Sequence, residues 1–255
     1  MKYFLILILS FYMSQSSYAQ DYEEIKKLAK QGDAEKQYDL GWGYMNGFVT
    51  SSRDPEKGFY WISKAANQEN VNAEYYLGYM YNYGFGIDQD LKKSFYWFTK
   101  AARQENVDTG KRYNHKEAQY NLATMYLWGK GTTVDYEKAL YWFTKLAEQR
   151  HEKSQYYLGM MYYVGAGTTV DHKKAGKLFI EAAKSNHSSA QYMIGQMIYH
   201  KEYEIQGYVK TVNGVTDYII PNKKVAAKWI KKAVDGRHKE AKEFWNKYEL
   251  WEYLK

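Results

Sequence analysis

The sequence contains no cysteine and only two prolines in 255 residues. The lack of cysteine excludes disulfide bonds, thiolate zinc sites and a cysteine nucleophile. After residue 19, no apolar run reaches the roughly 18 residues that a membrane-spanning helix needs. Hydrophobic residues nevertheless make up 45% of the chain, which carries 29 tyrosines and 8 tryptophans. This composition indicates a globular, helix-compatible protein that is rich in aromatic side chains.

The first residues have the pattern of an export signal. Lys2 precedes an apolar run at residues 3–13, and Ser17 and Ala19 are the small residues that a signal peptidase recognises. The run is too short to span a membrane comfortably. We therefore predict a signal peptide at residues 1–19, with an uncleaved N-terminal anchor as the alternative. Cleavage would place the mature chain in the periplasm or outside the cell, without stable membrane insertion.

An internal repeat determines the predicted fold. Five segments share a leucine or isoleucine followed directly by glycine or alanine: Leu40, Leu77, Leu122, Leu158 and Ile194. Seven positions after each of the first four comes a glycine: Gly47, Gly84, Gly129 and Gly165. An aspartate follows each of these glycines: Asp54, Asp90, Asp135 and Asp171. A large hydrophobic residue then completes each unit: Trp61, Trp97, Trp142, Leu178 and Trp229.

Each repeat is predicted to form two antiparallel helices. The glycine supplies positive φ where the first helix ends. The aspartate suits the N-cap of the second helix, where its side chain satisfies free backbone amides. Pro55, directly after Asp54, suits the first helical position. One helix pair cannot bury its apolar face alone, so successive pairs must stack.

The pattern A-x-x-x-L-G-x-x-Y-x-x-G-x-G-x-x-x-D, followed by K-x-x-x-W-x-x-K-A-A, resembles the Sel-like repeat family, a relative of the tetratricopeptide repeat. Residues 73–106 match it closely. The first repeat departs at Lys36, where alanine is usual, and lacks the second glycine of the turn; the fourth has Leu178 in place of tryptophan. The resemblance implies an all-α fold, a right-handed α/α superhelical solenoid of about five helix-pair repeats.

The solenoid is expected at residues 34–237, with repeats at about 34–70, 71–106, 115–150, 151–187 and 188–237. A capping helix at residues 20–33 precedes it, and an amphipathic capping helix at residues 238–255 closes it.

An insertion at about residues 201–220 lengthens the last repeat. It is predicted to form a β-hairpin, because β-branched residues flank Asn213-Gly214, the strongest two-residue turn signal. Its candidate partner-binding residues are Tyr208, Lys210, Asn213, Gly214 and Tyr218. The hairpin would serve as a partner contact or as a C-terminal lid. The alternative is a tolerated insertion that packs on the last repeat.

No pattern of catalytic or metal-binding residues accompanies the repeat. The six histidines include no pair at i,i+4 spacing and no H-E-x-x-H motif. Residues 129–133 lack the spacing of a phosphate-binding loop, and the same arrangement recurs at residues 165–169 as a repeat turn. We therefore expect no catalytic residue, no metal and no cofactor, and a non-enzymatic function.

By the same resemblance, the first helix of each repeat lines a concave face. Aromatic residues at its inward positions are the candidate partner-binding residues: Tyr38, Trp42, Tyr75, Tyr79, Tyr83, Tyr120, Trp128, Tyr156, Tyr163, Tyr192 and Tyr199. Aromatic side chains give a large contact area with a polar tip, as binding surfaces need. The alternative is that these tyrosines pack between adjacent repeats.

A second candidate surface is basic. Residues 221–255 carry ten lysines and arginines against five acidic residues. Five of the lysines share one predicted helix: Lys223, Lys224, Lys228, Lys231 and Lys232. Such a surface suits an acidic protein or an anionic envelope surface, with a solvated helix face as the alternative. Nucleic acid is not expected as a partner of an exported chain.

These features favour a periplasmic adaptor or scaffold that binds another protein, such as an envelope complex component. The family resemblance also implies protein–protein interaction. One alternative is an immunity protein that binds and neutralises a toxic secreted effector in the periplasm. A cell-wall-acting enzyme is a further alternative, for which the sequence offers no site.

Overall fold

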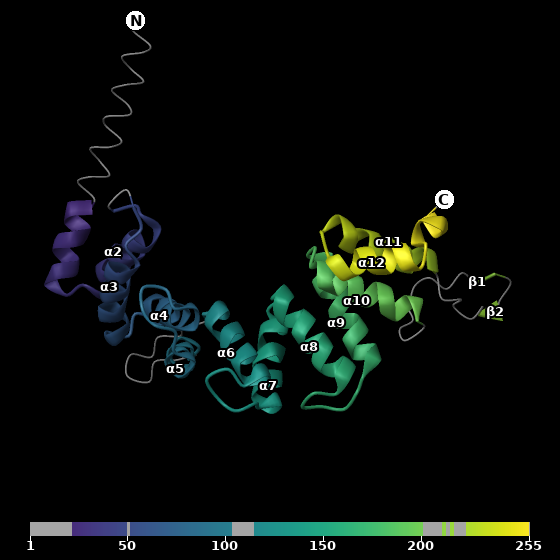
Figure 1. The fold of residues 1–255 in the computed structure, drawn as a ribbon. Coiled ribbons are helices and arrows are strands. Elements are labelled where there is room, and N and C mark those ends of the chain that lie inside the picture. The colour runs from purple at the N-terminus through teal and green to yellow at the C-terminus, as the bar shows by residue number, and fades with distance from the viewer. Residues whose placement is uncertain are drawn as a thin grey trace, which may run out of the picture. The chain divides into compact units, whose positions relative to one another are not determined.

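The computed structural model describes residues 22–49, 52–103, 115–200, 211–212, 215–216 and 223–254. The chain divides into two compact units, Met1–Val134 and Asp135–Lys255, here called unit 1 and unit 2. The architecture is all-α, and consecutive helices pack as pairs (Figure 1). The all-α class is confirmed, whereas the right-handed superhelix stays a prediction.

The first described residues of unit 1 form a helical segment at residues 22–31. Its further helices are α2 (Ala34–Asn46), α3 (Pro55–Asn67), α4 (Val71–Tyr83), α5 (Leu91–Ala101) and α6 (Lys116–Trp128). Helix α2 packs on α3 and α4 on α5, and the pairs are joined by contacts between α3 and α4. Helices α2, α4 and α6 are the first helices of their repeats, and α3 and α5 are second helices.

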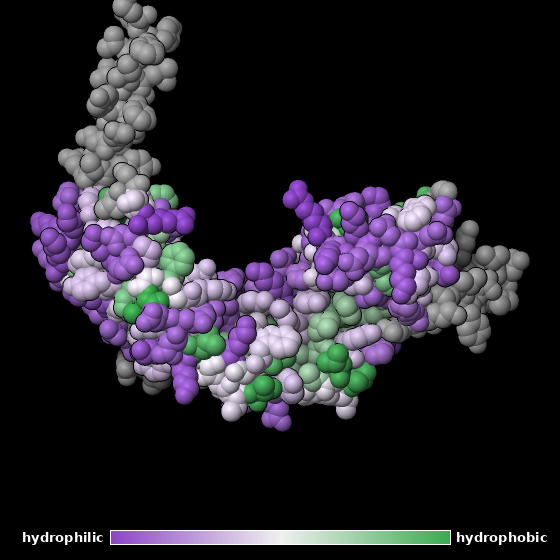
Figure 2. Space-filling model, in the orientation of Figure 1, coloured by the Kyte–Doolittle hydropathy of each residue, from purple (hydrophilic) through white to green (hydrophobic). Residues whose placement is uncertain are grey.

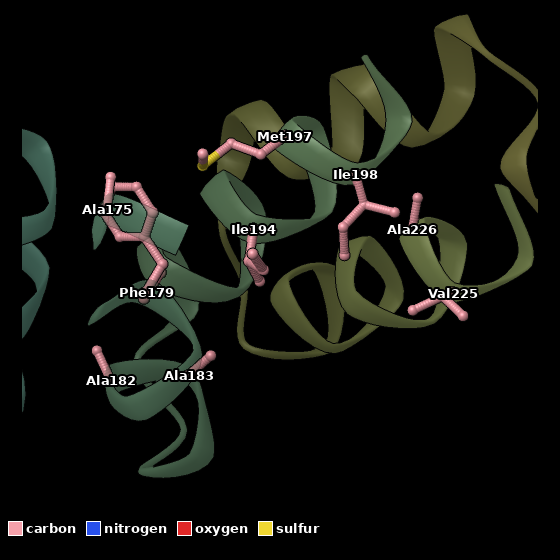
Figure 3. Close-up of a cluster of buried hydrophobic side chains, with 10 residues drawn as sticks. Ala175, Phe179, Ala182, Ala183, Ile194, Met197, Ile198, Val225 and Ala226 are labelled. Atoms are coloured by element: carbon pink, nitrogen blue, oxygen red, sulfur yellow. The ribbon is translucent and has the colours of Figure 1, made fainter. Parts of the chain in front are cut away.

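Unit 2 contains α7 (Tyr136–Glu148), α8 (Glu152–Val164), α9 (His172–Lys184), α10 (Ser188–Tyr199), α11 (Lys223–Asp235) and α12 (Lys239–Lys247). A 3₁₀ helix, η1 (Leu250–Leu254), follows α12. Helix α8 packs on α9, and α10 packs on both α9 and α11. Side chains of α9, α10 and α11 meet in one buried cluster, which includes Phe179, Ile194 and Ala226 (Figure 3).

The helix ends follow the sequence signals. The four aspartates that follow the turns cap α3, α5, α7 and α9, each accepting a hydrogen bond from a backbone N–H of the first turn. Glycines with left-handed backbone conformation end α2, α4, α6 and α8. Both sets of predicted caps are confirmed, so the repeat turns form where the sequence indicated.

Where a glycine follows the repeat leucine, it lets the two helices of a pair touch. A Cβ atom on Gly78 would lie 2.8 Å from Cδ1 of Phe98, and one on Gly159 would lie 2.8 Å from Cε1 of Phe179. The side chain that closes over the glycine thus comes one position after the tryptophan or leucine of the repeat pattern. Trp97 is only partly buried, although it also contacts the core.

The second glycine of the turn contacts the preceding repeat. A Cβ atom on Gly86 would collide with the carbonyl group of Pro55, and one on Gly131 would collide with that of Leu91. Pro55 and Leu91 are the first residues of α3 and α5. Only glycine therefore allows these turns to lie against the start of the preceding second helix.

A buried glutamine also joins successive repeats. Gln119 donates a hydrogen bond from Nε2 to the carbonyl oxygen of Ala102, and Gln191 donates one to Ala183. Both acceptors lie at or near the end of the preceding second helix, where backbone carbonyls lack helical partners. In α4 the equivalent residue is Glu74, which cannot donate and instead accepts from Nη1 of Arg103 at 2.7 Å.

The C-terminal region differs from the prediction. The closing helix ends at Lys247, and η1 begins only at Leu250. Glu249, between them, has a positive φ of 49°, a conformation that cannot continue an α-helix.

None of the helices among the described residues is long and apolar enough to cross a membrane.

The inserted segment is described at only four residues. Two-residue strands β1 (Thr211–Val212) and β2 (Val215–Thr216) pair antiparallel, with Thr211 opposite Thr216. The rest of the predicted hairpin lies outside the described residues, and so do Tyr208, Lys210, Asn213, Gly214 and Tyr218. The hairpin as a partner-binding element therefore stays a prediction.

Candidate functional site

The tyrosines two positions before the leucines lie between repeats. Tyr75 stacks on His115 with 4.3 Å between ring centroids, and Tyr156 stacks on His187 at 4.8 Å. Tyr192 lies tilted against His238, and Tyr38 lies tilted against Tyr76. Tyr38, Tyr75, Tyr120, Tyr156 and Tyr192 are all half-buried. Packing between repeats thus accounts for much of the surface of these tyrosines.

The histidines in these stacks are helix N-caps, which the sequence analysis missed. Nδ1 of His115 accepts a hydrogen bond from the backbone N–H of Ala118 at 3.2 Å. Three more helices, α8, α10 and α12, have the same kind of N-cap bond. Their capping residues are His151, His187 and His238. The spacing of 36 residues from His115 to His151, and again to His187, equals the repeat period and was the signal available.

Burial shifts the pKa values of several histidines and tyrosines in these stacks. It lowers the pKa of His115 and of His187 below the usual value of a histidine. It also raises the pKa of Tyr75 to about 12, assisted by the negative charge of Glu117. Neutral imidazole is the form that can accept a hydrogen bond at Nδ1, so the lowered pKa favours the capping state.

Four other predicted residues remain exposed, and all belong to first helices of unit 1. The exposed fractions are 37% for Trp42, 37% for Tyr79, 61% for Tyr83 and 60% for Trp128. Phe48, in the turn after α2, is 74% exposed and was missed, because its position in the turn did not suggest a contact surface. Together Trp42, Phe48, Tyr79, Tyr83 and Trp128 are called the aromatic surface.

Ring contacts hold part of the aromatic surface in place. The Trp42 and Phe48 centroids lie 5.4 Å apart, and those of Tyr79 and Tyr83 lie 4.5 Å apart. Nε1 of Trp42 donates a hydrogen bond to Oη of Tyr76 at 3.3 Å, which links α2 to α4. These contacts restrict the rings before any partner arrives, so binding would cost little side-chain entropy.

Two predicted contact residues of unit 2, Tyr163 and Tyr199, pack inside that unit. Tyr163 stacks on His172 of α9, with centroids 4.9 Å apart. Tyr199 lies against Phe244 at the C-terminal part of α12 and against Tyr248 just after it. Both tyrosines are half-buried, and each comes one repeat position before the site that Tyr83 and Trp128 occupy in unit 1.

Among the described residues, no group of three or more histidine, aspartate or glutamate side chains is placed to hold a metal ion. The arrangement presents rings and hydroxyl groups, which suit contact with another macromolecule.

Comparison with known families identifies the repeat. The Sel1 repeat profile matches residues 35–70, 71–106, 116–151, 152–187, 188–209 and 213–238, which is most of the chain. The chain belongs to the Sel1 repeat family. The resemblance derived from the sequence is thereby confirmed. Sel1 repeat solenoids are typical protein-interaction scaffolds, and Sel1 repeat proteins are generally non-catalytic.

Two solved structures resemble this Sel1 repeat protein. One is c5321, a protective antigen present in uropathogenic Escherichia coli strains, with 30% identity and a TM-score of 0.68. The match covers 84% of this chain but only 41% of c5321. The other is a Sel1 repeat protein from Oxalobacter formigenes, with 23% identity, a TM-score of 0.63 and 86% of each chain covered. This second similarity supports the fold alone. A search of curated protein sequences found no significant match.

Proposed function

We propose that this Sel1 repeat protein is a non-enzymatic adaptor of the bacterial envelope, which binds another protein through the first helices of its repeats. The aromatic surface of unit 1 is the observation that carries the proposal. Tryptophan and tyrosine are the side chains that most often dominate the binding energy of protein interfaces.

Two features support a binding role for these side chains rather than a packing role. They are exposed aromatic rings, whereas the same repeat positions of unit 2 hold Met160, Val164, Gln196 and His200. They also lie on or directly after successive first helices and are partly fixed by mutual ring contacts, as between Tyr79 and Tyr83. An exposed group of neighbouring aromatic residues typically marks an interaction site.

The proposed location is the periplasm, reached through the export signal at residues 1–19. This part of the proposal rests on the sequence pattern of a basic residue, an apolar run and small residues. The partner is then an envelope complex component or a secreted effector. In the second case the protein would act as an immunity protein.

Affinity capture from cells tests the proposal. The tagged protein and a Tyr83→Ala/Trp128→Ala variant are expressed at equal levels, crosslinked and analysed by mass spectrometry. We expect one or a few envelope proteins to be enriched with the wild-type chain and lost with the variant. Equal capture by both chains would contradict binding through the aromatic surface. A single captured protein whose toxicity is neutralised would identify the immunity role.

A further inference from the structure

Two second helices of unit 2, α9 and α11, carry an unusual set of exposed residues. On α9 the exposed residues are Lys173, Lys174, Lys177, Glu181 and Lys184. On α11 they are Lys223, Lys224, Lys228, Lys231, Lys232 and Asp235. The two helices thus expose nine lysines and two acidic residues, and no other residue type. This surface is called the lysine face.

The two acidic residues of the lysine face already pair with lysines of their own helices. Glu181 lies 2.7 Å from Nζ of Lys184, and Asp235 lies 2.9 Å from Nζ of Lys231. The net charge of the face is therefore strongly positive. In Figure 2 the surface where α11 and α12 lie is largely hydrophilic.

The geometry places these charges on one side of each helix. Lys224, Lys228, Lys231 and Lys232 follow the i, i+4, i+7, i+8 spacing of a single helical stripe. The opposite side of α11 is buried, with Ala226 in the cluster shared with α9 and α10 (Figure 3). Because α9 and α11 both turn their apolar sides to α10, their lysines point outward from unit 2.

At one repeat position, the lysine face has a lysine where α3 and α5 have a tyrosine. One residue before the repeat tryptophan, α3 and α5 expose Tyr60 and Tyr96, whereas α9 and α11 expose Lys177 and Lys228 at the same repeat position. Trp229 is partly buried, and Nζ of Lys232 lies 4.7 Å from its ring centroid. The described residues of α9 and α11 include no large exposed hydrophobic side chain.

We propose that the lysine face binds the surface of a bilayer containing anionic phospholipids. The cores of protein interfaces are depleted in lysine and need aromatic or arginine anchors, which this face lacks. Lysine ammonium groups are compact charges that need no fixed partner geometry, so they suit mobile headgroups. Each lysine near an anionic membrane adds to the attraction, so several on one face act together. The lysine face belongs to unit 2, whereas the aromatic surface belongs to unit 1.

Vesicle sedimentation tests this proposal with the full chain. Wild-type protein is mixed with vesicles of phosphatidylcholine alone, or of equal parts phosphatidylcholine and phosphatidylglycerol. Any contribution of the apolar run at residues 3–13 is common to both vesicle types. We expect binding to the anionic vesicles to be stronger and to decrease with added salt, because salt screens exposed charges. Equal binding to both vesicle types would overturn the proposal.

Two charge-reversal variants complete the test. Lys177→Glu/Lys228→Glu should lower binding to anionic vesicles at least about tenfold, while its circular dichroism stays that of the wild type. Lys92→Glu/Lys116→Glu changes the net charge equally on unit 1 and should retain most of the binding. Equal losses in both variants would overturn the lysine face as the site. Wild-type binding to polyglutamate but not to anionic vesicles would instead assign the face to an acidic protein.

Discussion

The ring of Tyr156 stacks on the imidazole of His187, with 4.8 Å between centroids and 25° between the ring planes. Tyr156 belongs to α8, and His187 precedes α10, so the stack joins two repeats. The same histidine accepts a hydrogen bond from the backbone N–H of Ala190 through Nδ1 at 3.2 Å. One side chain therefore caps a helix and connects it to its neighbour.

This arrangement predicts that acid weakens the fold. Burial lowers the pKa of His115 and His187 in the folded chain below the value of about 6.5 in the unfolded chain. The unfolded chain then binds more protons, so the free energy of unfolding is highest above pH 6.5 and falls as the pH drops through the folded pKa values. Urea unfolding at a series of pH values measures this decrease.

An asparagine variant separates capping from protonation. Asn70 caps α4 naturally through its side-chain oxygen, which does not titrate. His115→Asn/His187→Asn should therefore keep the helix caps and reduce the decrease of stability below pH 6.5. His187→Ala should instead lose about 1 kcal/mol at neutral pH, because the cap is removed. An unchanged pH dependence in the asparagine variant would exclude these histidines as its cause.

Enlarging the glycine at the helix crossing should destabilise the chain. In Gly159→Ala the new methyl group would lie 2.8 Å from the ring of Phe179, so the helices must separate or the ring must move. We expect a loss of about 1–3 kcal/mol in the free energy of unfolding. Adding Phe179→Leu should recover part of that loss, since it provides room. If Gly159→Ala is as stable as the wild type, the close packing of α8 on α9 is wrong.

Replacing a buried glutamine should lower the free energy of unfolding by a similar amount. Gln191→Leu removes the donor to the carbonyl oxygen of Ala183 and leaves that oxygen without this partner inside the protein. The expected loss is about 1–3 kcal/mol, measured by thermal or urea unfolding. Gln31→Leu, at an exposed position, serves as the control and should change stability little. Equal effects of the two substitutions would show that the bond contributes nothing specific.

Exposed and half-buried aromatic residues should respond differently to the same substitution. Tyr83→Lys should lower partner binding about tenfold or more while leaving the melting temperature unchanged, because Tyr83 is 61% exposed. Tyr156→Lys should lower the melting temperature, because its ring lies between repeats. The two variants are compared by binding to the captured partner and by thermal unfolding. A stability loss at Tyr83 with unchanged binding would move this residue from the aromatic surface to the core.

Much of the fold could be predicted because the repeat determines it locally. The turn glycines and capping aspartates act within a few residues of their own position, so Gly84 and Asp90 were assigned correctly from the sequence. Phe98 was overlooked because Trp97 beside it is equally large, and only the crossing angle of two helices decides which ring meets Gly78.

The candidate site was less predictable, because the exposure of a side chain depends on parts of the chain far from it in sequence. Every repeat offers an aromatic residue on its first helix, but its exposure depends on the element that covers it. Tyr199 is covered by α12, a helix that lies outside the repeat pattern. The histidine caps were missed because histidine is an uncommon N-cap, and its role depends on the tyrosine of the neighbouring repeat.

Site-specific photo-crosslinking in cells tests the adaptor function most directly. A photo-reactive amino acid replaces Tyr83 on the aromatic surface or, as a control, Tyr60, which is 51% exposed on the second helix α3. The account predicts covalent adducts with one or a few envelope proteins at Tyr83 and none of these at Tyr60. The same adducts at both positions, or none at Tyr83, would contradict a protein-binding surface on the first helices.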